Sequence, residues 1–306
     1  MDVEISKAAG LVAEEDAEPP GLGLNEAALP QPSATSRASC VQSEGDFWRL
    51  IPAYRDISEH SFLDHLWQSQ NAVTRVDKLA ATLGDLLPEP FFRDVQAGLQ
   101  RAPMSLRISP YIMALIDWSD PYSDPLRKQF LPLASEQIVD HPLVGLDSLH
   151  EQNDSPVPGL VHRYPDKALF LALDLCPVYC RFCTRSYSVG VDTEGVSKLH
   201  MRAKPERWEK TFEYLRNHPQ IEDVVISGGD VHNLRADQIA DIGHTLLDIP
   251  HIRRMRFATK AIAVQPTKFL TDDEWVSSLI SVAQRGRQMG KEVAVHTHVS
   301  HPREIT

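Results

Sequence analysis

Three of the chain's four cysteines lie within eight residues of one another, in the stretch CPVYCRFC. They are Cys176, Cys180 and Cys183, so their spacing is C-x3-C-x2-C. Three thiolates in one loop can hold three corners of a cubic iron–sulfur cluster, for which cysteine is the standard ligand. The fourth iron would have no protein ligand. It could chelate the amine and the carboxylate of an external molecule, such as the methionine part of S-adenosylmethionine.

Two other uses of clustered thiols fit the same residues. A structural zinc ion usually takes four ligands, and His162, His296 or His298 would have to supply the fourth. A redox dithiol shows a C-x2-C spacing near a β-α-β unit, which Cys180 and Cys183 satisfy. We favour the cluster because the cysteines follow a buried strand within a β/α alternation.

The second half of the chain alternates between predicted strands and helices. Short apolar runs predict buried strands at 168–175, 223–229, 252–259 and 291–298. Amphipathic helices are predicted between them, over PERWEKTFEYLRNHP, ADQIADIGHTLLDIP and TDDEWVSSLISVAQRGRQMG. Trp208, Phe212 and Leu215 share one face of the first helix. Thr271 is the expected N-cap of the last helix, and Gly290 marks its expected end.

This alternation predicts an α/β fold with parallel strands and right-handed crossovers, in a sheet or a barrel. The residues that follow the predicted strands are polar or reactive: CPVYCRFCTR, SGGD, ATK and HTH. Function in such folds gathers at the carboxyl ends of the strands. The sequence therefore predicts one site that all four of these segments line.

The composition excludes several classes of protein. Apolar residues make up 42% and charged residues 24% of the chain, as in an ordinary globular protein. The formal net charge of −11 disfavours a nucleic-acid binder, because no excess of Lys and Arg is available to neutralise phosphates. No apolar run reaches the roughly 18 residues of a membrane span. The acidic N-terminus lacks the order of a signal or transit peptide, and clustered free thiols need a reducing compartment, so we expect a cytosolic protein.

We expect three parts along the chain. Residues 1–45 predict a disordered tail, in which Cys40 is an idle thiol. Residues 46–150 predict a helical N-terminal region, and residues 151–306 predict the β/α part. Within them, residues 136–167 are expected to be irregular because of their prolines and glycine. Four strands leave an open edge, so we expect either a fragment or a partner that covers this edge.

Several segments resemble the lysine 2,3-aminomutase family of the radical S-adenosylmethionine superfamily. They are DPYSDPLRKQ, SPVPGLVHRYPDKALFLALDLCPVYCRFCTR, DVVISGGD and VHTHVSHPREIT, and the resemblance covers roughly residues 55–306. It implies a partial (incomplete) parallel β/α barrel of radical SAM type behind a helical N-terminal region. The implied cofactors are a [4Fe-4S] cluster, S-adenosylmethionine and pyridoxal phosphate.

The implied activity is that of an isomerase. A 5′-deoxyadenosyl radical would abstract hydrogen from an amino acid held by pyridoxal phosphate, and the amino group would migrate from the α to the β carbon. Lysine is the default substrate, with glutamate, arginine or a protein-bound lysine as other choices. A homo-oligomer is left open.

The resemblance also implies roles for individual residues. Cys176, Cys180 and Cys183 would be the cluster ligands. The methionine end of S-adenosylmethionine would be lined by Ser227, Gly228, Gly229 and Asp230, and His298 would lie near the adenosyl group. Arg185 matches the arginine that binds the substrate carboxylate, a task for which its planar fork is suited. The region near pyridoxal phosphate is matched by Arg163, Tyr164 and Lys167.

Each of these assignments has a structural alternative. SGG can be a simple turn from strand to helix, and His298 can be a structural hydrogen-bonding group. The residues of HRYPDK can form a loop ion pair and a packed tyrosine.

The sequence departs from the family pattern in three places. Ser-Tyr-Ser follows Arg185 where more arginines are typical, and residues 257–260 read FATK where Gly-Ser-Arg is expected. No glycine-rich run before a lysine precedes Thr306, and neither Lys260 nor Lys291 is in the place of the family's pyridoxal lysine. We therefore expect a C-terminally truncated member. The alternatives are a catalytically incompetent [4Fe-4S]-binding protein and a radical SAM enzyme that needs no pyridoxal phosphate.

Overall fold

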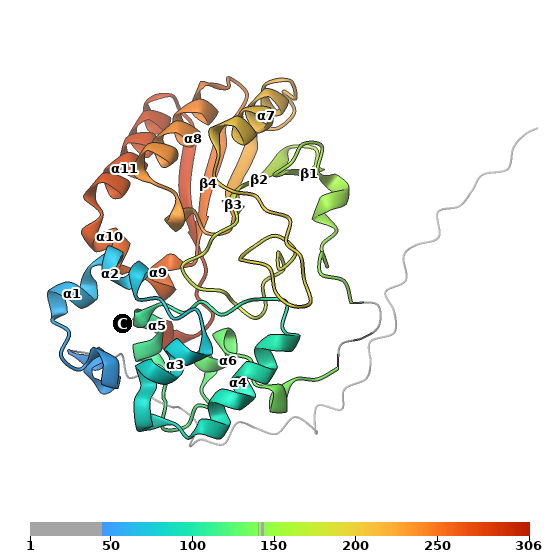
Figure 1. Cartoon of the computed structure of the whole chain (residues 1–306). Helices are drawn as coiled ribbons and strands as arrows, with labels where there is room; N and C mark the ends of the chain where they lie inside the picture. The colour runs from blue at the N-terminus through green and yellow to red at the C-terminus, as the bar shows by residue number, and fades with distance from the viewer. Residues whose placement is uncertain (1–44, 140, 142–143) are drawn as a thin grey trace, which may run out of the picture. The chain divides into compact units, whose positions relative to one another are not determined.

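The computed structural model describes residues 45–139, 141 and 144–306. Within them a five-stranded sheet has the order β1-β2-β3-β4-β5 (Figure 1). Its strands are β1 (Leu160–Tyr164), β2 (Lys167–Leu173), β3 (Asp223–Gly228), β4 (Arg254–Thr259) and β5 (Glu292–Thr297). Strands β2 to β5 are parallel, and β1 is antiparallel to β2. The predicted α/β class with parallel strands is confirmed.

Strand β1 lies in the segment that was expected to be irregular, and that expectation was wrong. The prolines and Gly159 precede the strand and do not interrupt it. Leu160 and Val161 are buried and pair with Phe170 and Leu169 of β2, and the register shifts before Tyr164. A short strand with an irregular register carries too little periodicity to be recognised from its sequence.

Helices between the parallel strands share one hydrophobic core with them. They are α7 (Pro205–Arg216), α8 (Ala236–Asp248) and α11 (Asp273–Gln288) (Figure 1). Trp208, Phe212 and Leu215 are buried on α7, as the helical period predicts. Two short helices, α9 (Ala261–Val264) and α10 (Thr267–Thr271), follow β4.

The start of α11 differs from the expected one. Asp272 is the N-cap, and its carboxylate accepts a hydrogen bond of 3.0 Å from the backbone N–H of Trp275. Thr271 instead ends α10, where its hydroxyl donates to the carbonyl of Thr267 at 2.9 Å. The predicted end is confirmed: Gly290 follows the helix with a φ of 66°, the left-handed conformation that glycine adopts readily.

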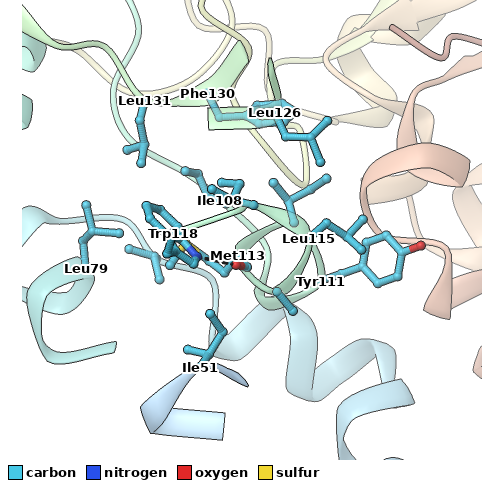
Figure 2. Close-up of a cluster of buried hydrophobic side chains, with 14 of the residues drawn as sticks. Ile51, Leu79, Ile108, Tyr111, Met113, Leu115, Trp118, Leu126, Phe130 and Leu131 are labelled. Atoms are coloured by element: carbon cyan, nitrogen blue, oxygen red, sulfur yellow. Dashed lines mark hydrogen bonds between the residues drawn. The ribbon is translucent and has the colours of Figure 1, made fainter. Parts of the chain in front are cut away.

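The helices that precede the sheet have a hydrophobic core of their own, part of which Figure 2 shows. They are α1 (Glu59–Leu63), α2 (His65–Gln70), α3 (Val76–Leu83), α4 (Glu89–Arg101), α5 (Pro110–Leu115) and α6 (Pro125–Phe130). Leu79, Ile108 and Trp118 are among its buried side chains. Val178 from the cysteine loop is buried in the same core, and Cys180 packs against it. The N-terminal helices therefore support the loop that carries the cysteines.

The structure does not test the predicted disordered tail or the role of Cys40. The predicted tail lies outside the described residues except for Gly45, and Cys40 lies outside them as well. In the described part of the chain, no helix is both long and apolar enough to cross a membrane.

Candidate functional site

The segments that follow β2, β3, β4 and β5 meet at the carboxyl edge of the sheet. A carboxylate oxygen of Asp230, after β3, accepts a hydrogen bond of 2.7 Å from the backbone N–H of Lys260, after β4. The Lys260 ammonium lies 3.0 Å from the hydroxyl of Ser300, after β5. The ring of Phe182, in the cysteine loop, lies 6.3 Å from the ring of His298. The structure thus brings together the strand ends that the sequence singles out.

The three clustered cysteines are free thiols in the loop that leaves β2. Cys176 and Cys183 pack against a small buried cluster of Met104, Tyr179 and Val189. Burial raises the pKa of the Cys176 thiol well above its ordinary value, and it raises the pKa of Cys180 to about 12. Burial raises the pKa of Cys183 as well.

These raised pKa values bear on the two alternative uses of the thiols. A redox dithiol needs a depressed pKa because the thiolate is its nucleophile, and the environment of Cys180 and Cys183 has the opposite effect. For zinc, His162 is engaged elsewhere, since its Nδ1 lies 2.9 Å from the hydroxyl of Tyr214 on α7. These observations weigh against the redox dithiol and against His162 as a fourth zinc ligand.

The donor set of three cysteines in one loop fits an iron–sulfur cluster in its chemistry, since cysteine thiolates are the standard ligands. Throughout the described ranges, no three His, Cys, Asp or Glu side chains form a group that could hold a metal ion. The thiols nevertheless share one electrostatic environment, because ionised Cys180 and Cys183 each raise the pKa of Cys176.

A basic side chain from a different segment stands near each cysteine. Arg107 lowers the pKa of Cys176, and Lys260 lowers that of Cys180, each against the larger effect of burial. Arg185 and, to a smaller extent, Lys198 act in the same way on Cys183. The Nε atom of Arg107 is buried without a hydrogen-bond partner. Sequence reasoning missed Arg107 and Lys198 because neither lies at a motif position.

The two glycines after β3 allow the cysteine loop to approach the sheet. Gly228 has a φ of 104°, and a Cβ added there would overlap sterically with the Leu173 carbonyl oxygen. The backbone N–H of Gly229 donates to the same carbonyl at 2.6 Å, and that of Asp230 donates to the Leu175 carbonyl at 3.0 Å. The close backbone approach that the sequence predicts is thus made to the residues just before Cys176. Contact of these glycines with a cofactor stays a prediction.

We expect Gly229→Ala to lower the free energy of unfolding by about 1–3 kcal/mol. The new Cβ would overlap the carbonyl oxygen of Leu175 and lie 2.6 Å from its amide nitrogen, and backbone atoms cannot move aside as a flexible side chain can. Chemical denaturation measures the loss. Gly195→Ala is the matched control, because a Cβ there meets no atom within 4 Å. Equal losses in the two variants would contradict this reading.

Asp230 is fully enclosed at the carboxyl edge and holds two strand ends together. Besides Lys260, its carboxylate accepts a hydrogen bond of 3.0 Å from the backbone N–H of His232. Burial raises the pKa of Asp230, and its hydrogen bonds, that from Thr259 included, oppose the rise. Ser227 is also buried. These two residues act first as parts of the scaffold beneath the cysteine loop.

Arg185 already holds a carboxylate of the protein itself. Its Nε and Nη2 atoms lie 2.9 and 2.8 Å from the two carboxylate oxygens of Glu151, a bidentate pair whose glutamate side chain is 5% exposed. The hydroxyl of Tyr187 donates to the same carboxylate at 2.9 Å. The pair uses two of the five N–H donors of Arg185, so both hydrogens of Nη1 and the second hydrogen of Nη2 remain for a further ligand. Sequence reasoning missed Glu151, since it lies in the segment expected to be irregular and no spacing links it to Arg185.

No protein-family model matches the chain. The chain is similar to the L-lysine 2,3-aminomutase of Clostridium subterminale, with 34% identity over 261 residues, which are 84% of this chain and 56% of that protein. It is similar also to the L-lysine 2,3-aminomutase of Bacillus subtilis, with 38% identity over 226 residues, which are 74% of this chain and 45% of that protein. The chain belongs to the lysine 2,3-aminomutase family.

The comparisons therefore confirm the family that the sequence motifs predict. A relative with another substrate in its name is the glutamate 2,3-aminomutase of Clostridioides difficile, 28% identical over 250 residues, or 81% of this chain and 53% of that protein. The chain spans about half the length of these curated relatives.

The residues that the family resemblance assigns to pyridoxal phosphate lie apart from the cysteine loop. Tyr164 pairs with Lys167 where β1 turns into β2, and Lys167 pairs with Asp223 at the start of β3. That is the amino edge of the parallel strands, opposite the cysteines. Arg163 forms an ion pair of 2.6 Å with Asp154, as its structural alternative predicts, whereas Tyr164 is 60% exposed and not packed. Their role in cofactor binding stays a prediction.

Proposed function

We propose that this chain is an aminomutase of the radical S-adenosylmethionine type, an isomerase that moves an amino group between adjacent carbons of an amino acid. The observation that carries the proposal is the 34% identity to an L-lysine 2,3-aminomutase over 261 residues, a match that covers the cysteine loop. The parallel strands and the gathering of their carboxyl ends support a partial β/α barrel of this superfamily.

In this proposal Cys176, Cys180 and Cys183 hold a [4Fe-4S] cluster at the mouth of β2. The segment after β3 (Ser227–Asp230) would receive the methionine end of S-adenosylmethionine, with His298 near its adenosyl group. When bound, the cluster and S-adenosylmethionine supply a carbon-centred radical. A reducing compartment such as the cytosol suits the free thiols of the loop.

Lysine is the substrate that we propose, and glutamate is the second candidate because of the similarity to a glutamate 2,3-aminomutase. Arg185 would orient the substrate carboxylate through its Nη1 atom, or by exchanging Glu151 for the substrate. The family resemblance assigns Arg163, Tyr164 and Lys167 to pyridoxal phosphate. Their position at the amino edge of the strands, opposite the cysteines, weighs against that assignment, because hydrogen abstraction needs the substrate beside the cysteine loop. The alternatives are a cluster-binding protein without catalysis and a radical enzyme that uses no pyridoxal phosphate.

Anaerobic reconstitution with iron and sulfide tests the proposal. We expect about four irons per chain. The loaded protein should then convert S-adenosylmethionine to 5′-deoxyadenosine in the presence of dithionite, and lysine to β-lysine once pyridoxal phosphate is added. Failure to gain iron would rule out the cluster. Formation of 5′-deoxyadenosine without a β-amino acid from lysine or glutamate would favour a radical enzyme of different chemistry. A loaded cluster without 5′-deoxyadenosine would favour the non-catalytic alternative.

A further inference from the structure

Lys198 is a buried lysine whose ammonium, among the residues that the structure describes, contacts neutral acceptors. It lies in the connection between β2 and α7, and 6% of the residue is exposed. The ammonium donates to the carbonyl oxygen of Pro103 at 2.5 Å and to that of Ser186, and it lies 3.9 Å from the sulfur of Met104. The nearby Asp192 carboxylate binds the backbone N–H of Lys198, at 2.7 Å, and not the ammonium.

These contacts join the cysteine loop to the N-terminal region. Ser186 follows the last cysteine of the loop by three positions, whereas Pro103 and Met104 follow α4. Met104 is itself buried in the small cluster against which Cys176 and Cys183 pack. The ammonium therefore borders the small cluster that also contacts two of the three cysteines.

A buried cation without an anionic partner costs free energy. Burial lowers the pKa of Lys198 accordingly. Other cations of this region are compensated: Lys260 lies 3.1 Å from the buried carboxylate of Glu304, and Arg185 is paired with Glu151. Within the described ranges Lys198 forms no ion pair. Besides Asp192, the group that raises its pKa against burial is Cys183, a cysteine that would become a thiolate when a cluster binds. A bound cluster with three thiolates carries net negative charge, and such charges set its reduction potential.

We propose that Lys198 is a positioning residue of the cysteine loop and the internal counter-ion of the cluster. Its hydrogen bonds hold the loop against residues 103–104, and its charge stabilises the reduced cluster, which carries one more electron than the oxidised form. The inference rests on the proposed function, because it needs the cluster. It adds a residue that no motif of the chain contains.

The test compares Lys198→Gln, which keeps hydrogen bonding and loses the charge, with Lys198→Arg, which keeps the charge. Each protein is reconstituted anaerobically with iron and sulfide, and the reduced cluster is counted by electron paramagnetic resonance at potentials set with dithionite. For Lys198→Gln we expect the ratio of reduced to oxidised cluster at a fixed potential to fall about tenfold, a shift of about 59 mV for one electron. Lys198→Arg should stay nearer to the wild-type value. Lys210→Gln, an exposed change on α7, is the control, because solvent and salt screen surface charges.

The outcomes separate this inference from the proposed function. If the wild type binds no cluster, the proposed function fails. If the wild type loads and Lys198→Gln has the wild-type potential, only the role of Lys198 is overturned. If Lys198→Gln does not load, loading of Lys198→Arg supports the inference, and its failure to load overturns the role of the charge.

Discussion

Replacing Cys180 by alanine is expected to reduce the iron content of the reconstituted protein from about four per chain to below about one. Two thiolates cannot hold a cubic cluster whose fourth iron already lacks a protein ligand. Formation of 5′-deoxyadenosine should fall by more than about 100-fold, since even the loss of groups that only orient metal ligands costs 10–100-fold. Iron analysis and product chromatography measure the two effects.

Cys40→Ala is the matched control for this variant. Cys40 lies outside the cluster motif and outside the described residues, so its removal should leave iron content and product formation unchanged. Unfolding curves show whether Cys180→Ala is still folded, which is expected because Cys180 only borders the N-terminal core. A Cys180→Ala protein that retained four irons would contradict the assignment of the ligands.

The part of the site that could be predicted from the sequence is the part governed by local chemistry. The spacing of Cys176, Cys180 and Cys183 indicates that the loop binds an iron–sulfur cluster. The alternation of strands and helices indicates that their loop would meet the ends of β3, β4 and β5, since parallel strands present their carboxyl ends together. The contacts between Asp230 and Lys260 and between Phe182 and His298 bear out this arrangement.

The features that the sequence could not predict depend on contacts between distant segments. Glu151 reaches Arg185 across 34 positions, and Lys198 reaches Pro103 across 95 positions, and no periodicity records such pairs. The N-cap of α11 is Asp272 and not the predicted Thr271, because the threonine hydroxyl forms a hydrogen bond within the preceding helix. Local propensity decides such choices only when no neighbouring element competes for the same atoms.

The helical N-terminal region supports the cysteine loop through hydrogen bonds that the loop donates to helix α6. The backbone N–H of Arg181, within the cysteine loop, donates to the carbonyl of Gln129 on α6 at 2.8 Å. Its guanidinium reaches the carbonyl of Lys128 at 3.2 Å. Helix α6 therefore supports the cysteine loop, and the stability of α6 affects the position of the loop.

Arg127→Met is expected to lower the free energy of unfolding by about 3 kcal/mol or more. The Arg127 side chain is fully buried. It donates to both carboxylate oxygens of Glu136 at 2.8 Å, and it also donates to the carbonyls of Pro121 at 2.5 Å and Tyr122 at 2.8 Å. Methionine fills most of the space but leaves these acceptors without a donor, which is the costly way to break a buried network. Denaturation in urea measures the loss. Arg75→Met is the control and should cost far less, because the ion pair of Arg75 with Asp77 lies in solvent, with side chains 74% and 67% exposed.

The loss from Arg127→Met should depend on pH in a defined direction. Hydrogen bonds from Arg127 hold the pKa of Glu136 below its ordinary value. The pair therefore stabilises the fold above the ordinary pKa of a glutamate, and this contribution disappears as the pH falls through the lower pKa of the folded state. The difference in free energy of unfolding between wild type and variant should be complete at pH 7 and shrink in acid.

Because α6 supports the cysteine loop, Arg127→Met should also lose iron faster than Arg75→Met when challenged with a chelator. Equal rates of iron loss in the two variants would show that helix α6 does not affect how firmly the loop holds the cluster.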